Sequence, residues 1–74
     1  MAKTSEEDAV YKIVEVVGTS SKSWEDAASS AVATASKTLH DLRIAEIMKL
    51  DMKVEGGKVV AYRTRVSLSF KYVP

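Results

Sequence analysis

The amino-acid sequence predicts an α+β subunit in which one helix packs on a three-stranded antiparallel sheet, in the chain order β-α-β-β. Three observations support this fold class: a run rich in β-branched residues near the N-terminus, an alanine-rich segment with helical spacing, and two alternating segments separated by two glycines. The last two segments follow each other directly, so they are expected to pair as a hairpin. The whole chain is therefore expected to be a split βαβ-like subunit.

The first strand and the helix make up the N-terminal half of the predicted fold. Val10 to Val17 is the β-branched run, and Gly18 begins the Gly-Thr-Ser-Ser segment that ends it. Ser23 fits a helix N-cap before acidic residues in the first turn, and we expect the helix to continue to about Leu39. Its apolar stripe comprises Trp24, Ala27, Ala28, Ala31, Ala35 and Leu39. Because most of these side chains are small, the helix should lie close to the sheet.

The C-terminal half predicts two alternating strands joined by a turn at Gly56 and Gly57. In both 43–54 and 59–73 the even-numbered positions are mostly apolar, and the odd-numbered positions carry most of the polar residues. A two-residue loop would pair even positions with odd ones, so we expect a loop of three or five residues. If all neighbouring strands are antiparallel, the third strand lies between the other two.

The composition indicates one small domain and no nucleic-acid partner. The chain has 74 residues, no cysteine, and a formal charge of +1 from eleven Lys and Arg against ten Asp and Glu. This charge balance argues against a nucleic-acid partner. Residues 1–9 are polar and predict a disordered tail, with the folded domain at 10–74. No apolar run suits a signal peptide or a membrane span, so we expect a cytoplasmic protein without a membrane partner.

The predicted third strand is too long for its own helix to cover. About 15 residues at about 3.3 Å each span roughly 50 Å, whereas about 16 helical residues at about 1.5 Å each reach roughly 24 Å. Without cysteine, neither a disulfide nor a thiolate metal site can support a thin core. We therefore expect other copies of the chain to cover the apolar sheet face. A bent or frayed third strand is the alternative.

The catalytic inventory is poor, so the chain is not expected to be an enzyme. It has one histidine, no cysteine and no glycine-rich phosphate loop. His40 follows the expected helix end, where a structural role is predicted. Trp24 is interpreted as an apolar anchor for the helix start rather than as a stacking platform. The carboxylates that can gather around a hard cation are those of Glu15, Asp41, Glu46, Asp51 and Glu55. Their spacing is not that of an EF-hand, but symmetry can present one carboxylate several times around an axis.

Several short sequence motifs, taken in order, resemble those of the dodecin family. They are Val10-Tyr11-Lys12, Gly18-Thr19-Ser20, Ser23-Trp24-Glu25, Ala45-Glu46-Ile47, Tyr62-Arg63 and Ser69-Phe70-Lys71. Dodecins are small βαββ proteins that assemble as hollow homododecamers and bind flavins, so the resemblance implies a shell of twelve subunits. The Ser-Trp-Glu helix start and the Asp-Met pair in the second strand are more similar to a branch that lacks the flavin-stacking Trp and includes calcium-binding dodecins.

The resemblance also implies which residues line a ligand site. Flavin-binding dodecins carry a Trp before an Ala-Glu-Val or Phe-Glu-Val motif, and this chain has Ile44 at that position, followed by Ala45 and Glu46. The family's flavin-contacting Gln corresponds to Arg63, and an Arg-Gly pair corresponds to a pair that begins with Asp51. These five residues are the candidate ligand-binding residues. Glu46 and Asp51 are also the candidate ligands for calcium or magnesium.

Three functions follow as alternatives. The first is a dodecin-like homododecameric shell that binds or stores a small ligand or a cation, in particular calcium. The second is a flavin-binding and storage dodecin that holds FMN or riboflavin. The third is a structural shell without a specific ligand. The changes at Ile44 and Arg63 predict flavin affinity far below that of typical dodecins, because an aromatic plate and a neutral amide are both missing.

Overall fold

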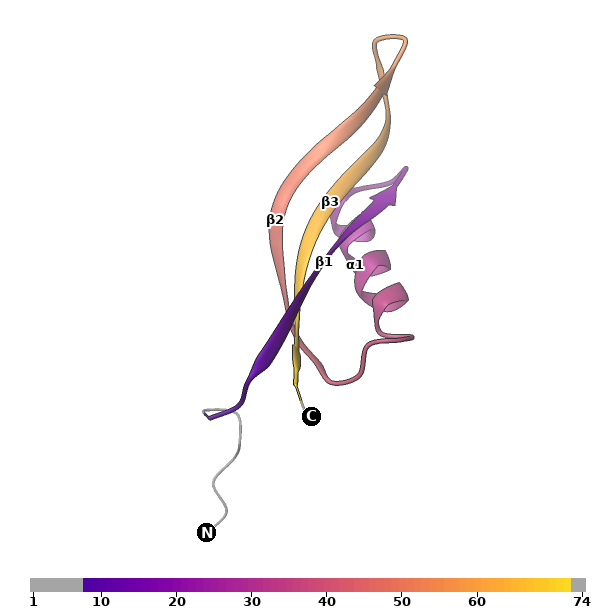
Figure 1. Ribbon diagram of the computed structural model, residues 1–74. Coiled ribbons are helices and arrows are strands. Elements are labelled where there is room, and N and C mark those ends of the chain that lie inside the picture. The colour runs from indigo at the N-terminus through magenta and orange to yellow at the C-terminus, as the bar shows by residue number, and fades with distance from the viewer. Residues whose placement is uncertain (1–7, 73–74) are drawn as a thin grey trace.

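The computed structural model describes residues 8–72 and confirms the predicted βαββ order. Its elements are β1 (Tyr11–Ser20), α1 (Trp24–Ala35), β2 (Leu42–Glu55) and β3 (Lys58–Lys71). The strand order is β1-β3-β2, and both pairings are antiparallel, so β3 is the central strand as expected. The helix connects β1 to β2 across one side of the sheet (Figure 1). The predicted tail at 1–9 lies mostly outside the described residues, and so does Val73, the predicted end of the last strand.

The start of α1 follows directly from its sequence, whereas its end comes earlier than predicted. The Ser23 side chain caps the helix by accepting a hydrogen bond of 3.0 Å from the backbone N–H of Asp26. The helix ends at Ala35, not at Leu39, because the following residues continue only as a turn. The backbone N–H of Leu39 still donates to the Ala35 carbonyl at 2.9 Å, and the Leu39 side chain packs against the core. The predicted apolar stripe is therefore correct although the helix is shorter.

The core is the narrow contact between the alanine face of α1 and the central strand. Its buried apolar residues are Ala27, Ala31, Ala35, Val66 and Leu68. Gly18 of β1 is buried beneath the helix, and a Cβ at this position would lie only 2.0 Å from the Ala27 carbonyl oxygen. Glycine thus allows the close approach that the small helical side chains predict.

The hairpin loop between β2 and β3 has two residues, so the predicted loop of three or five residues is wrong. Glu55 pairs with Lys58, and only Gly56 and Gly57 connect them, both with positive φ. An irregularity at Val60 in β3 then shifts the register by one residue. This bulge has the effect that was expected of a longer loop. Beyond it even-numbered positions pair with each other, as Met52 does with Tyr62 and Leu50 with Thr64.

Two further irregularities in β2 change which of its residues face the helix. The register shifts at Arg43 and again at Met48, so that each is an extra residue opposite β3. Between these two bulges the odd-numbered Ala45 and Ile47 pair with the buried Leu68 and Val66. The sequence prediction that even positions face the core throughout this strand is therefore wrong for this segment.

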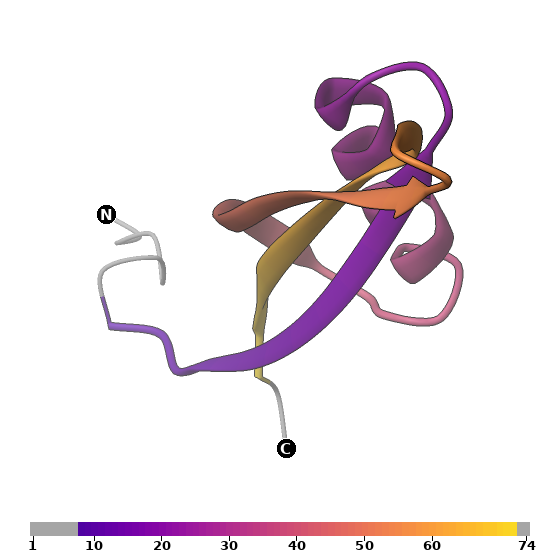
Figure 2. The same ribbon diagram turned by 90° about the horizontal axis from the view of Figure 1, so that it is seen from above.

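The helix covers β1 and β3 but leaves β2 open. Twelve helical residues reach about 18 Å, whereas the fourteen residues of β3 span about 46 Å. The hairpin tip projects beyond α1 and beyond the end of β1 (Figure 1), and α1 lies to one side of the twisted sheet when viewed from above (Figure 2). Exposed large apolar residues of the hairpin are Ile44, Ile47, Met48, Leu50, Met52, Val54, Val59 and Val60. A single chain therefore leaves much of its apolar sheet surface in contact with water, as the dimensions of the sequence predict.

Candidate functional site

The predicted ligand residues lie on two different sides of the sheet. We call the side turned away from α1 the far face; it carries the odd-numbered residues of β3. Ile44, Glu46 and Asp51 pair directly with Ser69, Ser67 and Arg63 of this strand, so their side chains share the far face. Ala45 is the exception, because it pairs with Leu68 and points to the helix side. The structure thus places four of the five predicted residues on the far face, at two separate places: Ile44 and Glu46 at one, Asp51 and Arg63 nearer the hairpin tip.

Arg63 and Asp51 form a bidentate ion pair on the far face. The Arg63 Nε donates to one carboxylate oxygen of Asp51 at 2.7 Å, and Nη2 donates to the other at 3.0 Å. These hydrogen bonds hold the pKa of Asp51 below its ordinary value of 3.8 and raise the pKa of Arg63. Both side chains are about half exposed. The Asp51 carboxylate is therefore already engaged, and a cation would have to compete with Arg63 for it.

Glu46 has a different environment from Asp51. It lies opposite Ser67 of β3, and Glu15 of β1 lies opposite the same serine from the other side. Neither glutamate forms an ion pair within residues 8–72. The next residues on this face towards the hairpin tip are Arg65 and Lys49, which pair with each other across the two strands. An acidic row thus lies beside a basic row on the far face.

The sequence indicates Glu15 only as one of five carboxylates that can gather around a hard cation, and it does not place Glu15 in a particular site. The sequence marks Glu15 only as a charged residue within a run rich in β-branched residues. Pairing it with Glu46 requires the bulge at Met48 to be known, since that bulge fixes the register of β2 on β3. Ser67 gave no signal of its own.

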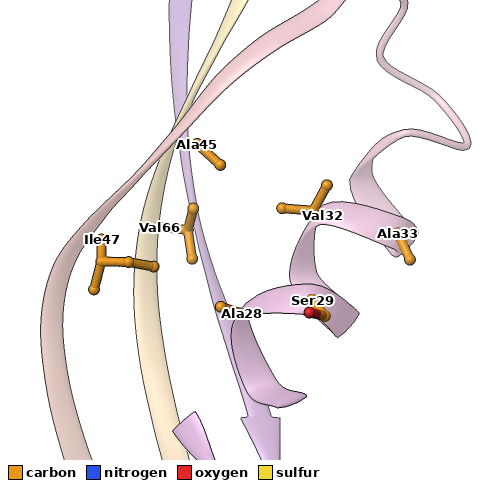
Figure 3. A pocket seen from close by; sticks show the side chains of 7 residues that line it. All are labelled: Ala28, Ser29, Val32, Ala33, Ala45, Ile47 and Val66. Carbon is orange, nitrogen blue, oxygen red and sulfur yellow. The ribbon is translucent and has the colours of Figure 1, made fainter. Parts of the chain in front are cut away.

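An apolar hollow lies on the helix side, between α1 and β2. This α1–β2 groove has a volume of about 430 Å³ and is lined by Ala28, Ser29, Val32, Ala33, Ala45, Ile47 and Val66. Figure 3 shows the sheet residues on one side of the groove and the helix residues on the other. Its walls are mostly apolar, and Ser29 is the one polar side chain among the residues that line it, so it offers contact area but little to orient a polar ligand. Ala45 contributes to this groove rather than to the far face.

Trp24 anchors the start of the helix on the hairpin, as the sequence predicts. Its ring packs edge-on against Tyr62, with the centroids 5.0 Å apart. The indole N–H donates to the backbone carbonyl oxygen of Asp51 at 2.9 Å. Thr64, which is fully buried, donates its hydroxyl to the Trp24 carbonyl oxygen. These contacts give Trp24 a packing role and join α1 to both strands of the hairpin.

Neither a preformed metal cage nor a membrane-spanning helix is present among residues 8–72. No three His, Asp or Glu side chains of this part of the chain cluster closely enough to hold a metal ion. His40 is exposed after the end of the helix. The one described helix is too short to cross a membrane. A cation site within one chain therefore needs oxygen ligands other than a carboxylate triad.

Comparison with known proteins identifies the family. A model of the dodecin family matches residues 10–73. The protein named Calcium dodecin of Mycobacterium tuberculosis is 39% identical over 66 residues, covering 89% of this chain and 93% of that protein. A crystal structure of calcium dodecin from the same organism, described as calcium-chelating with a novel calcium-binding site, is 42% identical with a TM-score of 0.78, covering 89% of this chain and 94% of its own. A dodecin from Streptomyces coelicolor is 31% identical with a TM-score of 0.85, covering 90% of this chain and 96% of its own. With the βαββ subunit already established, these matches show that the chain belongs to the dodecin family.

Proposed function

We propose that the chain assembles as a homododecameric shell that binds or stores a small ligand or cation, with calcium as the first candidate. The observation that carries the proposal is the 39% identity to a protein named for calcium, across 89% of this chain. The exposed apolar surface of the hairpin supports assembly, since other subunits can cover it. The role is binding rather than catalysis, and a cytoplasmic location stays a prediction.

The far face is where we propose that the ligand binds. Glu46 is the first candidate ligand, because its carboxylate is exposed and makes no ion pair within residues 8–72. Asp51 is the second candidate and would first have to leave Arg63. Ile44 lies on the same face beyond Glu46, while Ala45 could act only from the helix side.

Two measurements on the intact protein test the proposal. Native mass spectrometry should show twelve subunits, and a well-folded monomer at micromolar concentration would contradict the shell. Calorimetry on chelator-treated protein should show binding of calcium chloride, and bound calcium should raise the melting temperature by mass action. Glu46→Gln should weaken binding. Glu55→Gln at the hairpin tip is the matched control, because the ion pair that Glu55 makes among the described residues is with Lys53, away from the proposed site. Absence of both binding heat and a thermal shift would leave a structural shell.

Flavin storage is the second candidate function, and its test is independent of calcium. In flavin-binding dodecins flavin stacks on a Trp at the position of Ile44, and a flavin-contacting Gln stands at the position of Arg63, which is held here by Asp51. The natural chain should therefore bind FMN and riboflavin weakly, because the stacking surface is aliphatic and a fixed charge replaces the amide. Ile44→Trp combined with Arg63→Gln should restore quenching of flavin fluorescence. A yellow protein that retains flavin on purification would favour flavin storage over the cation.

A further inference from the structure

Three oxygen-bearing side chains form a row across all three strands of the far face. Glu15 of β1 and Glu46 of β2 are both direct cross-strand partners of Ser67 in β3. We propose that Glu15, Ser67 and Glu46 together form a binding site for a hard divalent cation, namely calcium, within a single subunit. This inference rests on the proposed function and assigns its ligands.

The register brings the two glutamates within reach of one ion. Neighbouring strands lie about 4.8 Å apart, so the Cα atoms of Glu15 and Glu46 are separated by about 10 Å. Directly opposed residues project their side chains to the same face, and each carboxylate needs only to lean inward over the central strand. The bulge at Met48 sets this alignment, because without it Glu46 would turn towards the helix.

Ser67 supplies the independent indication that the row accommodates a ligand. The residue is only 7% exposed, yet no residue among 8–72 forms a hydrogen bond with its side chain. No fully enclosed polar side-chain atom of the described residues lacks a partner. The Ser67 hydroxyl therefore reaches solvent on the far face, in the same row as Glu15 and Glu46. No protein group satisfies this hydroxyl oxygen, so it is available to a cation beside the two carboxylates that flank it in the register.

The donor set matches calcium better than magnesium or a transition metal. Two bidentate carboxylates and one hydroxyl provide up to five oxygens, and water can complete the six to eight that calcium takes. Magnesium requires a stricter octahedron, and the row contains no nitrogen or sulfur donor that would favour zinc or copper. Two carboxylates also balance the charge of one divalent ion.

The basic row beside the site opposes cation binding and gives the proposal a second test. Arg65 and Lys49 lie about one pleat away along the strands, at about 6.6 Å. Their charges repel a cation and attract the same glutamates, although no ion pair joins the two rows within residues 8–72. Neutralising Arg65 should therefore strengthen calcium binding. This effect has the opposite sign to that of removing a ligand.

The experiment is calorimetric titration of the chelator-treated, full-length assembly with calcium chloride. Glu15→Gln keeps the shape of an exposed side chain, and it should raise Kd by about tenfold or more. Ser67→Ala removes only the hydroxyl and should also weaken binding, although less. Arg65→Gln should lower Kd, and the control Glu55→Gln should leave it within about twofold. Circular dichroism and native mass spectrometry verify that each variant is folded and assembled.

The results separate this inference from the proposed function. If the natural chain shows no calcium binding, this inference and the calcium part of the proposed function are both overturned. If it binds calcium but Glu15→Gln and Ser67→Ala bind as tightly as the natural chain, calcium binding stands and this row is not the site. Loss of binding in Asp51→Asn with Glu15→Gln unchanged would likewise assign the ion to the Asp51 position and overturn the row. If Ser67→Ala fails to fold, Glu15→Gln and Arg65→Gln still decide the question.

Discussion

Replacing Gly18 by alanine should separate the helix from the sheet. The added Cβ would lie 2.0 Å from the Ala27 carbonyl oxygen and 3.0 Å from the Ala31 Cβ, whereas ordinary contact begins near 3.4 Å. The obstructing carbonyl belongs to the helix backbone, so no side-chain rotation can relieve the overlap. Overpacking typically costs about 1 to 3 kcal/mol, and a backbone obstacle places this variant at about 3 kcal/mol. For a domain of this size, that corresponds to a melting temperature lower by about 12 to 24 °C.

The assay is thermal unfolding followed by circular dichroism. All variants are compared at one fixed protein concentration, because the melting temperature of a self-associating protein depends on concentration. Gly57→Ala is the matched control, since its new methyl meets no atom within 4 Å and only its φ of 77° opposes the substitution. That control should cost about 1 to 2 kcal/mol. If Gly18→Ala melts no lower than Gly57→Ala, the close approach of α1 to β1 is not what limits this position.

Substitutions at three further positions test the core, the helix start and the ion pair. Leu68→Ala should lower the free energy of unfolding by about 2 to 5 kcal/mol in denaturant titrations, since the side chain is fully buried; a loss below about 1 kcal/mol would contradict its place in the core. Ser23→Ala should lower the free energy of unfolding by about 1 kcal/mol, because it removes the side chain that caps the backbone N–H of Asp26. Ser23→Gly should lower it clearly less, and equal losses in the two variants would show that the cap is unimportant. Arg63 lowers the pKa of Asp51, so the stability that the ion pair adds is present above the ordinary pKa of 3.8 and disappears as pH falls through the lowered value. The melting-temperature difference between the natural chain and Asp51→Asn should shrink accordingly, and a difference that persists at the lowest pH would exclude this pair as its source.

The element order and the central position of β3 could be predicted from the sequence because they depend on long, regular patterns. The alternating residues of the last strand fixed its buried side, and the structure buries Val66 and Leu68 as expected. The hairpin loop could not be predicted, because a bulge at Val60 corrects the register just as well as a longer loop. The helix end was missed for a related reason, since Leu39 keeps its core contact from a turn.

The site was harder to predict than the fold. Ile44, Glu46 and Asp51 could be named from a family resemblance, but the face on which each lies depends on the bulges at Arg43 and Met48. A bulge leaves little trace in a single sequence, because it changes the register of a strand without changing its composition. The row that includes Glu46 therefore became visible only when all three strands were paired.

The same bulges bear on how a single chain avoids aggregation. β2 is an edge strand of fourteen residues with exposed apolar side chains, which is the type of edge that recruits further strands and aggregates. Bulges at Arg43 and Met48 interrupt the even spacing of its free backbone groups, and charged Lys49 and Lys53 are interleaved with the apolar residues. A stray strand could pair in register only over short stretches of this edge. The irregularities that set the register of β2 thus also oppose the addition of further strands to its outer edge.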